Sequence, residues 1–216
     1  MSSTTARARF GAAALALAAV LFVLYPATRP WHDESTVDGA TSSLSSGWWV
    51  ASHLFAMIGF ILVPLGLLAL RDVVGRTRAA GNATAAVVCS WIGAGLVLPY
   101  YGAEDFALHA IARRAVAGQP PDLLELVDAI RFGPVQATMF GVGLFFLGAG
   151  AVLAAVAIWR SGVLPRYSGI PFALGFALLI PQFYTPAAVR IGHGVLVGAG
   201  LIWVAAGLWR AKPTRV

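Results

Sequence analysis

The sequence predicts an all-α fold, a polytopic membrane protein built as a bundle of six transmembrane helices. The first observation behind this prediction is composition: of 216 residues, 59% are hydrophobic and 11% are charged, with a mean hydropathy of +0.79. A soluble domain of this length cannot bury so much apolar surface. The second is that the apolar residues form long Ala, Leu, Val and Gly runs without the alternation of barrel strands, which favours helices.

Six apolar stretches account for the predicted spans, and each is close to the length of about 20 residues that crosses a bilayer. In chain order they cover residues 10–27, 48–70, 83–101, 134–159, 167–184 and 191–209. The first stretch also resembles a signal peptide, but it is long for one, and the residues from Tyr25 to Arg29 lack a small-x-small cleavage site. We therefore expect a retained anchor. Prolines 64, 99, 171 and 181 are expected to kink or end their helices.

The distribution of charge is the third observation, because Lys and Arg accumulate in short cytoplasmic segments. With both termini in the cytoplasm, ten of the 15 cations fall inside with a single acid, Asp72. The outer side then holds five cations and eight acids. The basic pI of about 10.2 follows from this asymmetry and does not indicate nucleic-acid binding. The preference for Arg over Lys and the frequent Ala and Gly are consistent with GC-rich bacterial coding, and we expect the bacterial cytoplasmic (inner) membrane.

Two outer connections are long. Residues 28–47 are rich in Ser, Thr and Asp and are expected to lie as a flexible flap on the membrane surface. Residues 102–133 are expected to continue as a helix over 103–117 and then to form a second, amphipathic helix in the interface, beginning at Pro121. Its apolar side is Leu123, Leu124, Val127 and Ile130, and its polar side is Asp122, Glu125 and Asp128. It would either cap a cavity or serve as a simple connector.

Candidate functional residues gather at the outer ends of the second, third and sixth spans. His53 and His193 lie about one turn inside their helices, and Glu104 and Asp105 lie where the third span emerges. Asp105, His109 and Arg113 recur every four residues, so on a continuing helix they share a face with the carboxylate within reach of the imidazole. Ionisable groups at membrane depth usually face the protein interior. The sequence therefore predicts one polar site at the outer face.

Three chemistries compete for this site. In the first, His53, His109, His193 and Asp105 bind zinc or a similar ion for metal-assisted hydrolysis. In the second, His53 and His193 are the axial ligands of a b-type haem. In the third, Glu104 or Asp105 is an acid that protonates a lipophilic substrate, as in isoprenoid cyclisation, with His109 beside it. The structural alternative is that each histidine bonds a carbonyl and the acids are a solvated helix end.

Several classes of function are excluded. Cys89 is the only cysteine, so the chain has no disulfide framework, no Cys-x-x-Cys pair and no thiolate metal cluster. No phosphate-binding Gly-Lys-Ser/Thr loop is present, which excludes ATP-driven pumping within this chain. The middle thirds of the spans contain no Asp, Glu, Lys or Arg, so a proton relay across the membrane has no titratable steps.

Residues 52–66, beginning Ser52-His53, together with residues 98–105 and Leu108-His109, resemble uncharacterised small multi-span bacterial membrane proteins. The resemblance implies about six helices in the cytoplasmic membrane and brings no activity with it. From the residues themselves we expect an enzyme acting on a lipophilic small molecule, in contact with membrane lipids. The alternative is a non-enzymatic transporter, sensor or accessory subunit.

Overall fold

The computed structural model describes residues 3–118 and 122–211, and this part of the chain is helical without strands. Five helical segments in it are long and apolar enough to cross a membrane, which indicates a multi-pass membrane protein. They are α1 (Ser3–Thr28), α3 (Gly47–Val74), α4 (Ala80–Gly102) with its continuation, α7 (Pro134–Ser161) and α9 (Ala187–Arg210). These helices contain the predicted first, second, third, fourth and sixth spans.

Local sequence explains where these helices begin and end. The side chain of Ser46 accepts a hydrogen bond from the Trp48 amide and so caps the start of α3. Pro134 occupies the first turn of α7, where its missing N–H is harmless. Gly162 ends α7 in the left-handed conformation, with φ +67°, which a residue with a side chain rarely adopts.

The helices pack closely through small residues. Helix α1 lies between α3 and α9, while α4 packs against α7. A Cβ on Gly194 would lie 2.8 Å from the carbonyl oxygen of Phe22, and one on Gly93 would lie 2.7 Å from that of Gly143. Only glycine permits these backbones to approach so closely, as in other membrane bundles. Gly194 and Gly198 are the positions at which α9 approaches α1 in this way.

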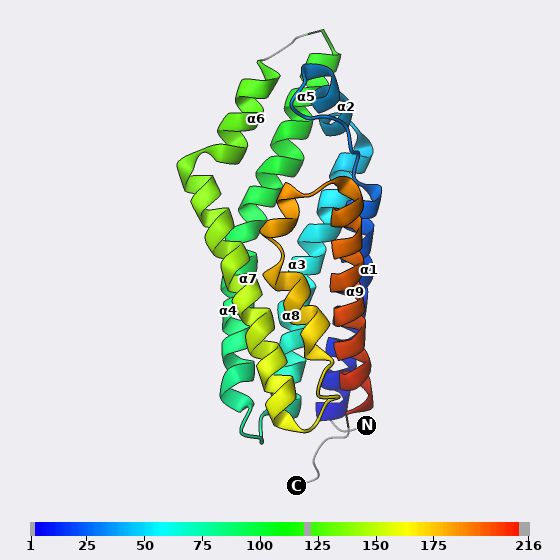
Figure 1. Cartoon of the computed structure of the whole chain (residues 1–216), viewed down its shortest axis with the longest axis vertical. Helices are drawn as coiled ribbons and strands as arrows, with labels where there is room; N and C mark the ends of the chain where they lie inside the picture. Colours follow the sequence, from blue (N-terminus) through cyan, green and yellow to red (C-terminus); the bar gives the residue numbers. More distant parts are fainter. Residues whose placement is uncertain (1–2, 119–121, 212–216) are drawn as a thin grey trace.

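The predicted fifth span, residues 167–184, is not one helix. The structure has a short α8 (Gly169–Ala177), a turn over residues 178–180, and a 3₁₀ helix, η2 (Pro181–Tyr184). Pro181 has no N–H to donate to the carbonyl of Ala177, which explains why the α-helix ends before it. The broken segment still leads from the end of α7 back towards the start of α9, at the other end of the bundle (Figure 1).

Three helices form a cap beyond one end of the bundle (Figure 1): α2 (Val37–Leu44), α5 (Leu108–Val116) and α6 (Leu123–Phe132). The cap has its own apolar core, separate from that of the bundle. Helix α5 continues α4 through one π-helical turn, η1 (Ala103–Ala107), so the predicted extension over 103–117 is confirmed. The cap core comprises Ala40, Leu44, Trp49, Leu108, Ala112, Leu123 and Val127.

Of the two long outer connections, the first differs from its prediction and the second agrees with it. The prediction of a flexible flap is wrong for residues 37–44, which fold as α2 because Thr36 caps the helix and Leu44 is buried in the cap core. The amphipathic helix is confirmed as α6, with Leu123 and Val127 buried. Asp122 accepts a hydrogen bond from the Glu125 amide and so caps this helix, while the predicted start at Pro121 lies outside the described residues.

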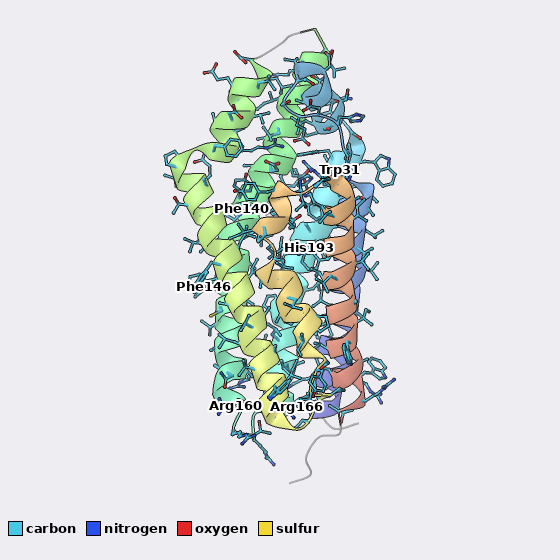
Figure 2. The ribbon with its side chains drawn as sticks, in the orientation of Figure 1. Trp31, Phe140, Phe146, Arg160, Arg166 and His193 are labelled. Carbon is cyan, nitrogen blue, oxygen red and sulfur yellow. The ribbon has the colours of Figure 1, made fainter. Side chains whose placement is uncertain are left out.

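The two ends of the bundle differ in character. Helix α1 begins and α9 ends at the end opposite the cap, which we call the terminal end (Figure 1). The guanidinium group of Arg9 lies 5.4 Å from the ring of Trp209 and links the two helices there. Arg160 and Arg166 lie at the same end, whereas Trp31 lies towards the cap (Figure 2). The candidate site residues therefore belong to the cap end.

Candidate functional site

A network of ion pairs connects the cap to the bundle. Arg131, on α6, contacts Glu104 with its Nη2 at 2.8 Å and Glu34 at 2.8 Å. Glu34 also pairs with Arg29, at 2.7 Å. These four side chains, Arg29, Glu34, Glu104 and Arg131, are the outer network, and each is 16% exposed or less. Ions that are so little hydrated depend on their partners, so the network holds together three segments distant in sequence.

Trp49 forms the floor of the outer network. The guanidinium carbons of Arg29 and Arg131 lie 4.8 and 5.8 Å from its ring, within the range of cation–π attraction. Its indole N–H donates to the carbonyl oxygen of Glu104, at 3.1 Å. Burial alone would lower the pKa of Arg131, but the carboxylates of Glu104 and Glu34 outweigh that effect and raise it above its ordinary value. Arg131 is therefore charged at any physiological pH.

The π-helical turn η1 carries the two predicted acids and gives them different surroundings. Glu104 joins the outer network, whereas Asp105 is fully buried, and neither of its carboxylate oxygens has a hydrogen-bond partner within the described residues. The prediction that Asp105 reaches His109 is wrong. A π turn inserts an extra residue into the helix, so spacing by four no longer keeps two side chains on one face.

His109 holds the cap together. Its Nδ1 lies 2.7 Å from the carbonyl oxygen of Leu44, and because a carbonyl only accepts, this nitrogen donates. The bond ties α5 to the end of α2. His109 is therefore a structural link between two cap helices and is not engaged with either acid of η1.

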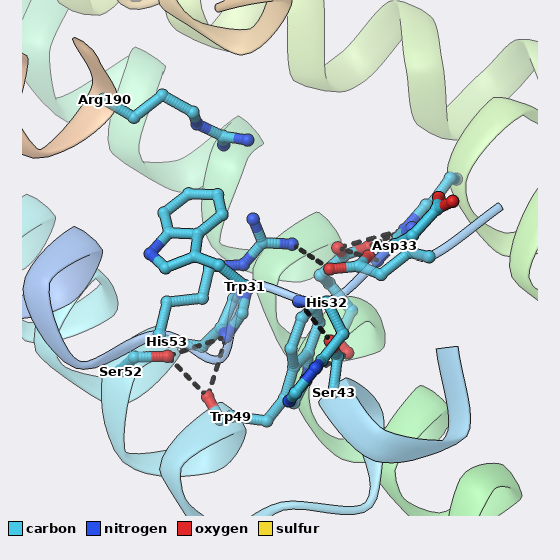
Figure 3. A network of polar contacts seen from close by, with 12 residues as sticks. Trp31, His32, Asp33, Ser43, Trp49, Ser52, His53 and Arg190 are labelled. Atoms are coloured by element: carbon cyan, nitrogen blue, oxygen red, sulfur yellow. Dashed lines mark hydrogen bonds and ion pairs between the residues drawn. The ribbon is translucent and has the colours of Figure 1, made fainter. Parts of the chain in front are cut away.

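His53 is buried beneath the outer network. Its Nδ1 donates to the carbonyl oxygen of Trp49 at 2.8 Å and lies 3.4 Å from the Ser52 hydroxyl (Figure 3). Three aromatic rings surround it, with centroids at 4.2 Å for Trp49, 5.5 Å for Tyr25 and 5.8 Å for Tyr101. His53 thus occupies an aromatic enclosure.

His193 is held by the break between α8 and η2. Its Nε2 donates to the carbonyl oxygen of Gly175 at 2.7 Å. In a continuous α-helix that oxygen would accept from the Leu179 amide, but Leu179 instead donates to Phe176, at 3.3 Å. The early end of α8 therefore provides the acceptor that fixes the imidazole of His193.

A small cavity of about 30 Å³ lies at the cap end between α1, α3, α4, α8, η2 and α9, and we call it the outer cavity. Its polar lining is Tyr25, Tyr101, Gln182, Arg190 and His193. The hydroxyl of Tyr101 donates to that of Tyr25, at 3.4 Å. The rest of the lining is mostly apolar: Phe22, Pro26, Trp31, Phe60, Phe176, Leu179, Gly194 and Val197.

Arg190 and Trp31 lie together beside this cavity (Figure 3). The guanidinium carbon of Arg190 is 4.9 Å from the Trp31 ring and 5.1 Å from that of Phe183. Its Nε donates to the side-chain oxygen of Gln182, at 3.1 Å. Arg29 approaches the same Trp31 ring, at 4.6 Å. The indole of Trp31 therefore contacts two guanidinium groups, one from the outer network and one from the cavity lining.

The predicted convergence is partly present. His53 and His193 are brought near the same tyrosine pair, since Tyr25 and Tyr101 contact His53 and also line the cavity with His193. Glu104, Asp105 and His109 do not line the cavity. No group of three or more His, Cys, Asp or Glu side chains among the described residues is placed to hold one metal ion.

The residues do not fit the two cofactors considered from sequence. The zinc ligands predicted, His53, His109, His193 and Asp105, are not gathered as one donor set. A haem between His53 and His193 would have to displace the rings of Tyr25 and Tyr101, because the cavity there measures only about 30 Å³. We derive no chemistry through either group.

Sequence reasoning missed the outer network and the role of Arg190. Arg131 is the one cation in the amphipathic segment 122–133, which otherwise carries three acids, and this isolation is a signal for a specific partner. Arg190 lies just before the last apolar stretch, where a cation on the outer side is unusual. The signal at Arg131 does not identify its partners, because Glu104 and Glu34 lie 27 and 97 positions away in the sequence.

Comparison with known proteins leaves the site to be judged on its geometry. No family model matches the chain, no curated protein matches it, and no solved structure matches it. The resemblance noted in residues 52–66 and 98–109 stays a prediction.

Proposed function

We propose that this protein crosses a bacterial inner membrane six times, with both termini in the cytoplasm, and binds a lipophilic small molecule at its outer face. The observation that carries the proposal is the outer cavity, where aromatic and aliphatic side chains meet a few polar groups. Ligand sites are typically concave and mostly apolar, with a small number of polar groups that orient the ligand.

The orientation rests on charge. The terminal end carries Arg7, Arg9, Arg71 and Arg160, and the cap carries most of the acids, so the positive-inside rule favours the terminal end in the cytoplasm. The predicted fifth span, α8 with η2, then completes the six crossings. A broken helix is tolerated at membrane depth where it is buried in protein or lines a cavity, and Leu179 and Gln182 in this segment do line the cavity.

Cysteine accessibility in intact cells tests this topology. In a Cys89→Ser background, Arg114→Cys on exposed α5 should react with a membrane-impermeant maleimide, and Val163→Cys, between α7 and α8, should react only after the cells are opened. The reverse pattern would overturn the orientation. Labelling of both from outside would overturn the number of crossings.

The position of the cavity suits a ligand that enters from lipid. A cavity of about 30 Å³ admits one or two water-sized groups, so a larger ligand requires that part of the lining move. Leu179 is the candidate, because it lies in the turn between α8 and η2, where regular helical hydrogen bonds are interrupted. Displacing this one leucine would enlarge the cavity at the broken segment.

Binding is better supported than catalysis. The acids and the histidine chosen from sequence as catalytic, Glu104, Asp105 and His109, lie outside the cavity lining, and Glu104 is committed to Arg131. Enzymatic activity on a lipophilic substrate stays a prediction. A receptor or carrier needs only the cavity and a segment that can move, and the interrupted hydrogen bonds between α8 and η2 support this segment as the one that moves.

Photolabelling tests ligand binding directly. The protein is reconstituted in nanodiscs and irradiated with a diazirine analogue of decanol, and the labelled residues are mapped by mass spectrometry. We expect labels on the cavity-lining parts of α1, η2 and α9. Leu179→Trp fills the cavity and should reduce this labelling at least about fivefold, while Leu178→Trp should not, because Leu178 is 42% exposed and Leu179 is 7% exposed.

The matched pair makes the test decisive. Both variants place the same bulky side chain at adjacent positions of one segment, so loss of labelling in both would indicate general damage and contradict the cavity as the site. Labelling spread evenly over the lipid-facing helices of the wild type, without competition by unlabelled decanol, would overturn the proposed function.

A further inference from the structure

We propose that the outer cavity selects a monoanionic amphiphile, a molecule with one carboxylate head and an apolar tail, and that Arg190 is the residue that recognises the carboxylate. This inference rests on the proposed function and adds the chemical class of the ligand. Four features of the cap end support it: a cation without a carboxylate partner, one buried N–H donor without an acceptor, the N-terminus of α9, and the size and lining of the cavity.

The first feature is an excess of positive charge. Around Trp31 and Trp49 lie three guanidinium groups, from Arg29, Arg131 and Arg190, but the network holds only two carboxylates, from Glu34 and Glu104. Both carboxylates are taken by Arg29 and Arg131. Within the described residues no carboxylate lies within ion-pair distance of Arg190, whose side chain instead bonds a neutral amide, that of Gln182. One cation beside the cavity is left for a ligand.

The second feature is an unsatisfied donor behind the same indole. The side chain of Arg29 is 8% exposed, and its Nε is buried without a hydrogen-bond partner within the described residues. Such donors are rare in native proteins, because leaving one unpaired is costly. Arg29 contacts the Trp31 ring from which Arg190 is 4.9 Å away. An anion at Arg190 would therefore also benefit from the field of Arg29.

The third feature is the N-terminus of α9. Its N-cap is Pro186, which provides no side chain to accept from the first amides, and the helix is 24 residues long. The positive end of the helix dipole is therefore not neutralised by a capping side chain. Arg190 lies in the first turn of this helix, so the dipole and the guanidinium favour an anion at the same place.

Size and lining decide between kinds of anion. A phosphate dianion would need two cations that have no carboxylate partner, and of the three arginines only Arg190 has none within the described residues. The small cavity suits a head of few atoms, and the hydroxyl of Tyr25, which accepts from that of Tyr101, keeps its own proton to donate to a carboxylate. Phe22, Phe60 and Phe176 line the same cavity and offer an apolar surface to the first carbons of a tail. The favoured ligand is an amphiphilic carboxylate, and a free small anion is the competing outcome.

Competition for the neutral photoprobe tests the inference. In nanodiscs of zwitterionic lipid, unlabelled decanoate, decanol and acetate are titrated against the diazirine decanol analogue. We expect decanoate to displace the probe at a concentration at least about tenfold lower than decanol, since charge-assisted hydrogen bonds contribute that much. Acetate, which lacks the tail, should displace it poorly. In Arg190→Gln, decanoate should lose its advantage and displace the probe no better than decanol does.

Control variants distinguish a specific role of Arg190 from a general effect of surface charge and from misfolding. Arg114→Gln removes one exposed cation of the cap and should leave decanoate competition unchanged. Arg190→Lys keeps the charge and should retain part of the preference, which guards against a glutamine variant that fails to fold. Equal loss in Arg114→Gln and Arg190→Gln would overturn the role of Arg190.

The remaining outcomes distinguish the two proposals. If decanol and decanoate compete equally with the wild type, the cavity binds lipophiles but does not select an anion, and the inference is wrong while the proposed function stands. If acetate competes as well as decanoate, the site is one for small anions. If none of the three displaces the probe, the proposed function itself fails.

Discussion

The two ends of the bundle use the same charged groups in opposite ways. At the cap end, Arg29, Glu34, Glu104 and Arg131 are between 8% and 16% exposed and pair at 2.7–2.8 Å. At the terminal end, Asp72 lies 3.6 Å from Arg7 and 3.3 Å from Arg71, whose side chains are 69% and 53% exposed. Exposed pairs contribute little, whereas breaking a buried pair leaves an uncompensated charge. The cap end therefore uses charge to fix structure, whereas the charges of the terminal end contribute little to stability and serve the orientation that we propose.

The outer network also explains how a cap made of short helices stays in place. Its members come from the connection after α1, from η1 and from α6, and Trp49 beneath them belongs to both the cap core and α3. A helix of ten residues such as α6 is marginal alone, so its position depends on such tertiary contacts. The network is the link that holds α6 to η1 and to the connection after α1.

The largest effect is expected for Arg131→Ala. It leaves Glu34 and Glu104 little exposed and without this cation, and we expect a loss of about 3 kcal/mol or more in the free energy of unfolding. Reversible unfolding in bicelles, followed by tryptophan fluorescence, measures it. The control is Arg114→Ala, which removes an exposed cation of α5 and should change the unfolding free energy by less than about 0.5 kcal/mol. Equal effects in both variants would remove the distinction between network and surface charge.

Smaller effects on the free energy of unfolding are expected at two neighbouring residues of η1, and the two effects have opposite signs. Glu104→Gln should destabilise by about 2 kcal/mol, because it removes a charged partner of Arg131. Asp105→Leu should stabilise by about 1 kcal/mol, because it replaces a buried carboxyl that has no hydrogen-bond partner within the described residues with an apolar group of similar shape. The same unfolding measurement compares them. Destabilisation by Asp105→Leu would instead indicate that this carboxyl has a partner that the protein chain does not supply, and so a functional role.

The fold was largely predictable because hydropathy is a local property. The spans expected at 48–70 and 134–159 appear as α3 and α7 with ends within a few residues. The span at 167–184 has the same apolar composition but is broken, and Pro181 was the visible reason. Helix α2 was missed because its composition is polar; Thr36 followed by Asp38 is its capping signal, but burial of Leu44 depends on α5 and α6.

The site was less predictable because it depends on which distant residues pair with one another and on the helical register at η1. The sequence left open whether these histidines bind a cofactor or a carbonyl, and the structure shows a carbonyl for each: Trp49 for His53, Gly175 for His193 and Leu44 for His109. The π turn changed which side of the helix Asp105 faces, and no local pattern indicates such a turn. The outer network joins residues from distant segments, so hydropathy carries no information on it.

The smallest effect is expected at the terminal end. Arg7→Gln removes a pair with Asp72 whose N–O distance is 3.6 Å and whose arginine is 69% exposed, so the free energy of unfolding should change by less than about 0.5 kcal/mol. Asp72 keeps Arg71 as a partner, at 3.3 Å, which limits the consequence further. The bicelle measurement used for Arg131→Ala checks this value directly. A loss at Arg7 comparable to that at Arg131 would mean that exposure does not govern the strength of these pairs, because the two ends would then respond alike despite the difference in hydration.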